Sequence, residues 1–187
     1  MAAMSIGQHG EGGPGADGVP AGWPARLLYI GVVGAGDEDQ QTNRAAEAVG
    51  RGVARAGAVL VCGGLEGVMA AACRGARAEG GHTLGLLPGV DRAAGNRWLE
   101  FALPTGLGEV RNALVVRAAD ALVAVGGGFG TLSEIALALK AGTPVVGLGT
   151  WELARGGRDV DAVVRADTPE AAVALAVELA RATAGFV

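Results

Sequence analysis

The sequence predicts an α/β fold with a single doubly wound, mostly parallel sheet and helices on both faces. Continuous apolar runs without polar alternation recur along the chain, which is typical of strands buried on both faces. Segments with helical spacing lie between them, and short glycine turns join the two kinds of segment. With 187 residues, 50% of them hydrophobic, the chain suits one domain with a sizeable core.

Each element follows from its own pattern. Strands are expected at residues 27–33, 58–62, 83–87, 121–125 and 144–148, with shorter ones at 98–103 and 161–164. Helices are expected at about 41–56, 67–79, 108–119 and 131–141. A last helix should begin at Thr168-Pro169-Glu170, with Thr as N-cap and Pro at the first helical position.

Composition indicates what precedes the domain and which partners are not expected. Residues 1–25 are rich in Gly and Pro, and we expect a flexible tail there ahead of a domain over 26–187. No apolar run approaches the roughly 20 residues of a membrane span, so no membrane partner is expected. The net charge of -4 argues against a nucleic-acid partner.

The cysteines and histidines give no metal-binding pattern. Cys62 and Cys73 form no CxxC pair, and the chain has only two His, so no metal site is expected. We interpret both cysteines as small, buried, reduced residues of a cytoplasmic protein.

Three glycine turns follow predicted strands, at the end where α/β sheets bind ligands. They contain Gly34 and Gly36, then Gly63, Gly64 and Gly67, then Gly126, Gly127, Gly128 and Gly130. Together they predict one crevice for a nucleotide-like ligand. The first turn lacks the third glycine of a dinucleotide fingerprint, since Asp39 stands there, and no P-loop lysine follows any turn.

The third turn runs directly into a predicted helix that starts at Thr131. Glycines let a ligand approach the main chain, and the free N–H groups of a helix N-terminus favour phosphate. Glu134 would add a carboxylate to that site. A purely structural interpretation is also open, in which Thr131 and Glu134 form a capping box.

Two segments together resemble a known family. They are Arg111-Asn112 and Gly127-Gly128-Phe129-Gly130-Thr131-Leu132-Ser133-Glu134, and the turn at 63–69 is similar as well. They resemble the Rossmann-like family of the Lonely Guy phosphoribohydrolases, once labelled "possible lysine decarboxylase". The resemblance covers roughly residues 27–150. Three departures bring the chain closer to the branch that holds molybdenum-cofactor carrier proteins: Gly126 replaces Pro, Asn112 replaces Lys, and Ser133 replaces a second Glu.

The resemblance implies roles for these residues. Glu134 would act at a glycosidic bond, and Arg111 would hold the phosphate or position the sugar. Backbone N–H groups and a hydroxyl would wrap the phosphate, from Gly127, Gly128, Gly130 and Thr131. The other predicted ligand-binding residues are Asn112 and the glycines of the first two turns, Gly34, Gly36, Gly63, Gly64 and Gly67. From the pattern alone, Arg111 also fits an ordinary solvated helix arginine.

Two functions therefore stay open. The first is the binding or carrying of a phosphorylated ligand, a nucleotide or molybdenum cofactor, with no further cofactor required. The second is hydrolysis of nucleoside 5′-monophosphates of the cytokinin type at the N-glycosidic bond, by Glu134 and Arg111. The resemblance further implies a homodimer or homotetramer.

Overall fold

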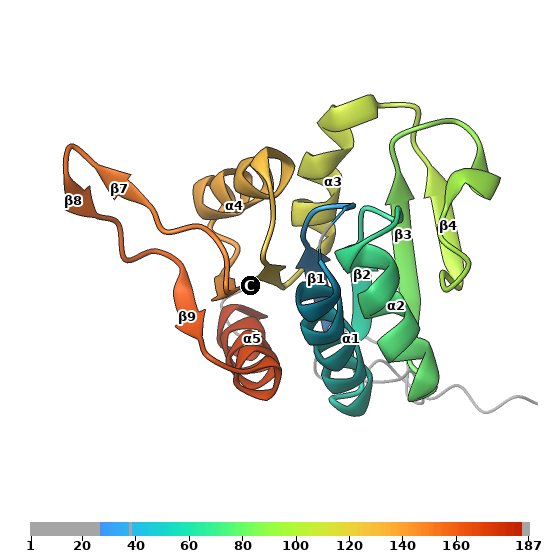
Figure 1. The fold of residues 1–187 in the computed structure, drawn as a ribbon, viewed down its shortest axis with the longest axis horizontal. Helices are drawn as coiled ribbons and strands as arrows, with labels where there is room; N and C mark the ends of the chain where they lie inside the picture. Colours follow the sequence, from blue (N-terminus) through green and yellow to red (C-terminus); the bar gives the residue numbers. More distant parts are fainter. Residues whose placement is uncertain (1–26, 38, 185–187) are drawn as a thin grey trace, which may run out of the picture.

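Seven parallel strands form one sheet in the order β4-β3-β2-β1-β5-β6-β9 (Figure 1). This computed structural model describes residues 27–37 and 39–184, so the tail predicted at 1–25 lies outside it. The strands of the sheet are β1 (Tyr29–Val33), β2 (Val59–Cys62), β3 (Thr83–Leu87), β4 (Phe101–Pro104), β5 (Ala121–Val125), β6 (Val145–Leu148) and β9 (Val164–Ala166). The doubly wound parallel sheet is confirmed.

Helices cover both faces of the sheet. The α-helices are α1 (Gln40–Arg55), α2 (Val68–Ala78), α3 (Asn112–Ala118), α4 (Phe129–Ala141) and α5 (Pro169–Ala184). Two short 3₁₀ turns, η1 (Arg92–Ala94) and η2 (Gly108–Arg111), lie in the connections. One core packs β1, β2 and β5 against α1, α2 and α5, and a second packs the other face against α3 and α4 (Figure 1).

Side chains alternate between these two cores along each buried strand. In β1, Ile30 and Val32 belong to the first core and Val33 to the second, and all three are at most 1% exposed. This burial on both faces explains the apolar runs in the sequence.

Helices α1 and α2 approach each other backbone to backbone. A Cβ at Gly50 would overlap the carbonyl of Ala72, and one at Gly75 would overlap the carbonyl of Glu47. Only glycine fits at these two crossing points. Glycine at these positions therefore serves the close packing of the two helices.

The direction of winding reverses between β1 and β5. From β1 the chain proceeds through α1 to β2 on one side, whereas β5, on the other side of β1, leads through α4 to β6. In open α/β sheets, ligands bind outside the carboxyl ends of the strands at such a reversal. The turns after β1 and β5 carry Gly34, Gly36 and the Gly126–Gly130 segment, so the topology sets two of the three predicted turns side by side.

Several boundaries differ from the sequence predictions. Residues 98–100 are irregular and β4 begins at Phe101, because Asn96 and Thr83 hold this segment with side-chain hydrogen bonds. The predicted helix at 108–119 is a 3₁₀ turn followed by the shorter α3. The edge strand lies at 164–166, later than expected. The hairpin of β7 (Ala154–Arg155) and β8 (Arg158–Asp159), which was not predicted, projects beyond α4 (Figure 1).

Within the described ranges, no helix has the length and apolar character needed to cross a membrane.

Candidate functional site

A pocket of about 890 Å³ opens at the carboxyl ends of the strands, where the glycine turns were predicted to meet. Most of the predicted site residues line it: Gly34, Gly36, Gly63, Arg111, Asn112, Gly128, Gly130, Thr131 and Glu134. Gly64, Gly67 and Gly127 do not line it. These three have positive φ angles of 77°, 64° and 108° and shape the turns behind the pocket wall.

The N-terminus of α4 faces this pocket. Gly128 is the N-cap and makes no side-chain capping bond. The first bond of the helix runs from the Leu132 N–H to the Gly128 carbonyl (3.0 Å). The N–H groups of Phe129, Gly130 and Thr131 precede that bond, so they point toward the open end of the helix. Such an end attracts anions.

The capping box predicted at Thr131 and Glu134 is wrong. The helix starts two residues earlier than expected, so Thr131 is its third residue rather than its N-cap. The Thr131 side chain is buried, and its Oγ1 has no hydrogen-bond partner among the described residues. Glu134 turns toward Arg111 instead of the helix start. Gly127 allows this turn, because it has a φ angle of 108° and a Cβ there would be 2.5 Å from the Cβ of Thr131.

The N-terminus of α1 is closed by the chain itself. The Asp39 carboxylate accepts hydrogen bonds from the N–H groups of Gln41 (2.6 Å) and Thr42 (2.9 Å). Both bonds lower the pKa of Asp39. In a dinucleotide-binding fold the pyrophosphate lies at this helix end. Asp39, which replaces the third glycine of the fingerprint, therefore places its own carboxylate where the pyrophosphate would lie.

Arg111 is the buried cation of the site. It is 7% exposed, so the interpretation as a solvated helix arginine is wrong. Its guanidinium lies over the backbone of Gly63, where a Cβ would be 2.6 Å from Nη2 and 2.7 Å from Cζ. Glycine at 63 is therefore what makes room for Arg111. Burial lowers the pKa of Arg111, and Glu134 opposes that effect; an arginine remains charged at neutral pH.

Glu134 is the buried carboxyl of the site. It is 6% exposed, and its Oε1 lies 3.8 Å from Nη1 of Arg111. Burial raises its pKa to about 7, with Arg111 acting in the opposite direction. Glu134 therefore exchanges its proton near neutral pH, which is the property required of a general acid or base.

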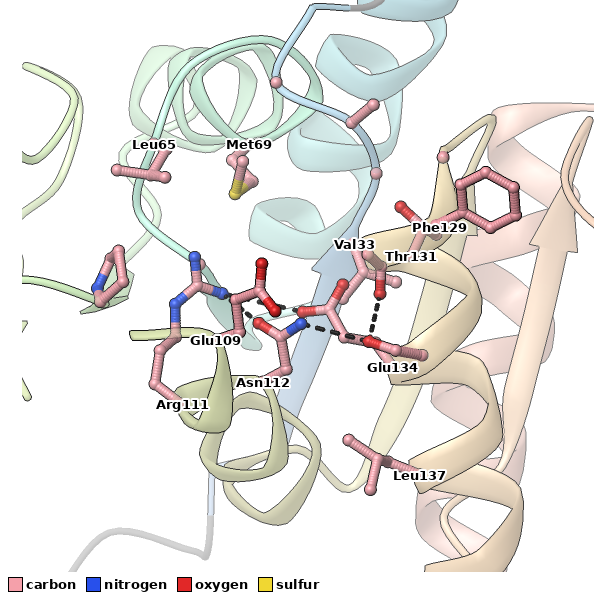
Figure 2. Close-up of a pocket in the computed structure, with 18 of the residues that line it drawn as sticks. Val33, Leu65, Met69, Glu109, Arg111, Asn112, Phe129, Thr131, Glu134 and Leu137 are labelled. Atoms are coloured by element: carbon pink, nitrogen blue, oxygen red, sulfur yellow. Dashed lines mark hydrogen bonds and ion pairs between the residues drawn. The ribbon is translucent and has the colours of Figure 1, made fainter. Parts of the chain in front are cut away.

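A chain of hydrogen bonds joins Arg111 to the glycine turn (Figure 2). Nη1 of Arg111 donates to Oδ1 of Asn112 (2.9 Å), and Nδ2 of Asn112 donates to Oγ of Ser133 (3.3 Å). The Ser133 hydroxyl then donates to the Gly130 carbonyl (2.7 Å). Two of the three positions that depart from the phosphoribohydrolase pattern, Asn112 and Ser133, are thus neighbours. Asn112 positions Arg111 and the turn relative to each other.

Sequence reasoning missed the residues that brace the turn from behind. The Thr150 hydroxyl donates to the Gly126 carbonyl (2.5 Å), and Nε1 of Trp151 donates to the Gly128 carbonyl (3.1 Å). Trp151 also packs against Phe129, with ring centroids 5.6 Å apart. These residues follow β6, and because β6 pairs with β5 the two strands end side by side. In the sequence, the adjacency of these two strands was the only signal for such support of the turn.

An apolar wall completes the pocket. Leu65 and Met69 line it from the α2 side and Leu137 from α4, with Val33 at its floor (Figure 2). The Glu109 side chain points into the same space (Figure 2). Arg117 and Glu66 are exposed and do not line the pocket. Across the part of the chain that is described, no three His, Cys, Asp or Glu side chains gather as a metal site would require.

Comparison with known proteins places this chain in a family. The model of the SLOG cluster4 family matches residues 27–173. The chain belongs to the SLOG cluster4 family. The resemblance to the Lonely Guy-type proteins is thereby confirmed. An uncharacterised protein of Archaeoglobus fulgidus is 45% identical over 123 residues, which are 66% of this chain and 81% of that protein.

Two solved structures are similar to this SLOG protein over almost their whole length. The molybdenum cofactor binding protein of Rippkaea orientalis is 33% identical with a TM-score of 0.75, over 83% of this chain and 99% of that one. The Moco carrier protein of Chlamydomonas reinhardtii is 36% identical with a TM-score of 0.74, over 84% and 99%. The predicted closeness to the carrier branch is thereby confirmed.

Proposed function

We propose that this SLOG protein binds and carries a phosphorylated ring compound of the molybdenum-cofactor type, a pterin phosphate, in the pocket at the carboxyl ends of the strands. The observation that carries the proposal is its similarity to molybdenum-cofactor binding and carrier proteins across nearly their full length. The cofactor is cargo in this function, and no further cofactor is required.

The polar half of the pocket suits the phosphate. The uncapped end of α4 offers N–H groups, and Arg111 adds the buried positive charge. Nε of Arg111 and Oγ1 of Thr131 are buried and lack partners among the described residues. A buried polar group without a partner costs free energy, which a ligand oxygen would recover. Gly34, Gly36, Gly63 and Asn112 would form the walls that hold the phosphate end in place.

The apolar half of the pocket suits the ring. Leu65 and Met69 lie on the α2 side of the polar groups and Leu137 lies beyond Glu134 on α4 (Figure 2). A thioether packs well against an aromatic system. A volume of about 890 Å³ falls within the range of small-molecule sites, about 300–1,000 Å³. The pocket therefore has room for a ring system together with its phosphate.

Titration of the protein with a pterin monophosphate and with AMP, followed by calorimetry, tests this proposal. The Arg111→Gln variant should bind the pterin monophosphate about 10–100-fold more weakly, the value of one hydrogen-bonded charge. Arg117→Gln serves as the matched control, because Arg117 is exposed on the adjoining helix α3. Equal binding by the Arg111 variant and the wild type would contradict the phosphate role of Arg111.

Glu134 favours a second candidate function, the hydrolysis of nucleoside 5′-monophosphates. Cleavage of an N-glycosidic bond develops positive charge on the sugar, which a carboxylate stabilises while it activates water. Glu134 is a buried carboxyl with a pKa of about 7. Its Oε1 lies 3.8 Å from Nη1 of Arg111, the cation that would hold the phosphate. Both groups line the pocket, so it contains the carboxyl and the phosphate-binding cation that hydrolysis would require.

Chromatography of nucleoside 5′-monophosphates, cytokinin nucleotides included, separates the two functions. A hydrolase releases free base and ribose 5-phosphate, and Glu134→Gln abolishes that release. A carrier leaves every nucleotide intact, and its Glu134→Gln variant still binds the pterin monophosphate.

The proposal includes a homo-oligomer, a dimer or tetramer, in the cytoplasm, where the two free thiols stay reduced. An apolar patch supports the assembly. It comprises Phe101, Leu103, Leu107, Val110 and Leu114, which are 39–71% exposed. These residues lie on β4, in and just before η2, and on α3; β3 contacts β4 and η2, and η2 contacts α3. Large exposed apolar patches are typical of protein–protein interfaces.

A further inference from the structure

Two thiols meet directly behind the pocket wall. Sγ of Cys62, at the end of β2, lies 3.5 Å from Sγ of Cys73 in α2, and both residues are fully buried. They are the only two cysteines of the chain. Neither side chain lines the pocket, so the proposed function does not use them.

Cys62 connects this pair to the pocket through the adjoining glycines. The N–H of Gly64 donates to Sγ of Cys62 (3.3 Å), and Gly63 between them carries the guanidinium of Arg111 on its backbone. The guanidinium of Arg111 rests on the Gly63 backbone, so a movement of this turn shifts the surface that supports it. A change at the sulfur of Cys62 therefore reaches the cation of the pocket.

We propose that Cys62 and Cys73 form an oxidisable dithiol whose conversion to an intramolecular disulfide, by hydrogen peroxide or another small hydroperoxide, displaces Arg111 and weakens ligand binding. The two sulfurs need to approach by about 1.5 Å to reach a disulfide bond length of about 2.05 Å. The movement removes the Gly64 hydrogen bond from Cys62. Its effect on the ligand rests on the proposed function, whereas the disulfide itself does not.

The environment assigns different parts to the two thiols. The hydrogen bond from Cys73, the Gly64 N–H and the charge of Arg111 lower the pKa of Cys62 against its burial. The hydrogen bond to Cys62 and burial raise the pKa of Cys73. Because its sulfur accepts the Gly64 N–H (3.3 Å), which stabilises a thiolate, Cys62 is assigned as the nucleophile and Cys73 as the resolving thiol.

The chemistry is balanced in two steps. The Cys62 thiolate attacks one peroxide oxygen, the O–O bond breaks, and the departing hydroxide takes a proton to give water and a sulfenic acid. The Cys73 sulfur then attacks the Cys62 sulfur, the S–O bond breaks, and the departing hydroxide leaves with the Cys73 proton as water. Two thiols are oxidised and one hydrogen peroxide is reduced to two waters.

Thiol counting and intact mass on the full chain test this inference directly. Hydrogen peroxide should remove both thiols and two hydrogen atoms of mass per chain, with no cross-linked dimer on a non-reducing gel, and dithiothreitol should reverse the change. A bulky aromatic disulfide reagent should not react with the folded protein, because both thiols are buried. Cys73→Ser and Cys73→Ala should each leave a sulfenic acid at Cys62 that a dimedone probe labels once the treated protein is unfolded in urea.

Calorimetry with the pterin monophosphate then compares the reduced and oxidised proteins. Oxidation should weaken binding about tenfold or more, which corresponds to about 1.4 kcal/mol, and peroxide should not change binding by Cys62→Ala, which lacks the sulfur that contacts Gly64. Two thiols that survive peroxide treatment sufficient to oxidise the urea-unfolded chain would overturn the dithiol. So would a disulfide between chains. A disulfide that leaves binding unchanged would overturn the link to Arg111, and an absence of binding in the reduced protein would contradict the proposed function instead.

Discussion

Two opposing influences act on Glu134. Its burial favours the neutral carboxyl, whereas Arg111 at 3.8 Å favours the carboxylate, and burial prevails. The same burial keeps Arg111 away from competing water. An incoming phosphate would lie beside both groups, and it would be attracted by the guanidinium and repelled by an ionised Glu134. The proton of Glu134 thus decides the net charge that the ligand meets.

The part of the protein's stability that depends on Glu134 should fall as the pH rises from about 4.5 to about 7 and level off above that. In this window the unfolded chain has lost the Glu134 proton at its ordinary pKa of 4.5, while the folded chain keeps it up to about 7. Since the folded state then binds more protons, stability decreases with pH. The contribution amounts to about 3 kcal/mol, at about 1.4 kcal/mol per pKa unit. Urea unfolding between pH 4.5 and 8 measures it.

The Glu134→Gln variant provides the comparison. It should lose this part of the pH dependence and exceed the wild type in stability at pH 8, with the difference shrinking toward pH 4.5. Glu178→Gln, on an exposed position of α5, controls for the substitution itself and should follow the wild-type profile. Parallel profiles of Glu134→Gln and wild type would show that Glu134 is not held protonated.

A methyl group at position 63 should weaken binding without unfolding the protein. In Gly63→Ala the new Cβ meets the guanidinium of Arg111, which is the far end of a flexible side chain and is able to move aside. The displaced guanidinium loses its hydrogen bond to Asn112, and pterin monophosphate binding should fall about tenfold or more. Gly89→Ala, where a Cβ has open space, is the control. Unchanged affinity in Gly63→Ala would show that Arg111 does not need its present position.

At the scale of elements, the strands were predictable because burial on both faces leaves an unbroken apolar run. β3 and β5 have the predicted bounds, and the Thr168 hydroxyl accepts from the Ala171 N–H (3.2 Å) as a predicted N-cap should. The β7–β8 hairpin was not predictable, since its exposed strands of two residues each carry no apolar pattern.

The site was predictable only in part. Glycine turns mark the pocket because they follow strands, and parallel strands end at one edge. The burial of Arg111 was not visible, because it depends on the absence of a Cβ at Gly63, which is far away in the sequence. The support from Thr150 and Trp151 likewise arises from the pairing of β5 with β6. Local patterns carry no information about such distant contacts.

The crossing of α1 and α2 should tolerate no side chain at Gly75. Alanine normally stabilises a helix relative to glycine by about 0.5–1 kcal/mol. Here the methyl would overlap the carbonyl of Glu47 and push the helices apart, so Gly75→Ala should lose about 1–3 kcal/mol, as overpacked cores do. The midpoint of thermal unfolding should fall by about 2–4 °C for each kcal/mol. Gly130→Ala, a helical glycine with open space, should equal or exceed the wild type. A stabilised Gly75→Ala would contradict the backbone contact.

At the scale of the whole molecule, the pocket and the apolar patch share structural elements. Val110 of η2 belongs to both, and α3, which bears Leu114, packs against α4 with its pocket residues. A second copy seated on the patch would therefore fix the elements that hold Arg111 and Glu134. Assembly and ligand binding should then depend on the same surface.

Charged residues in the patch should separate the assembly into single chains. In a Phe101→Glu and Leu114→Glu double variant, each carboxylate would be buried in an apolar interface, at a cost that association does not offset. Analytical ultracentrifugation should give two or four times the chain mass of 18.4 kDa for the wild type and 18.4 kDa for the double variant. Val164→Glu, an equally exposed valine on β9 at the opposite edge of the sheet, should keep the wild-type mass. A double variant that still assembles would place the interface elsewhere, and a wild type that sediments as one chain would exclude the oligomer.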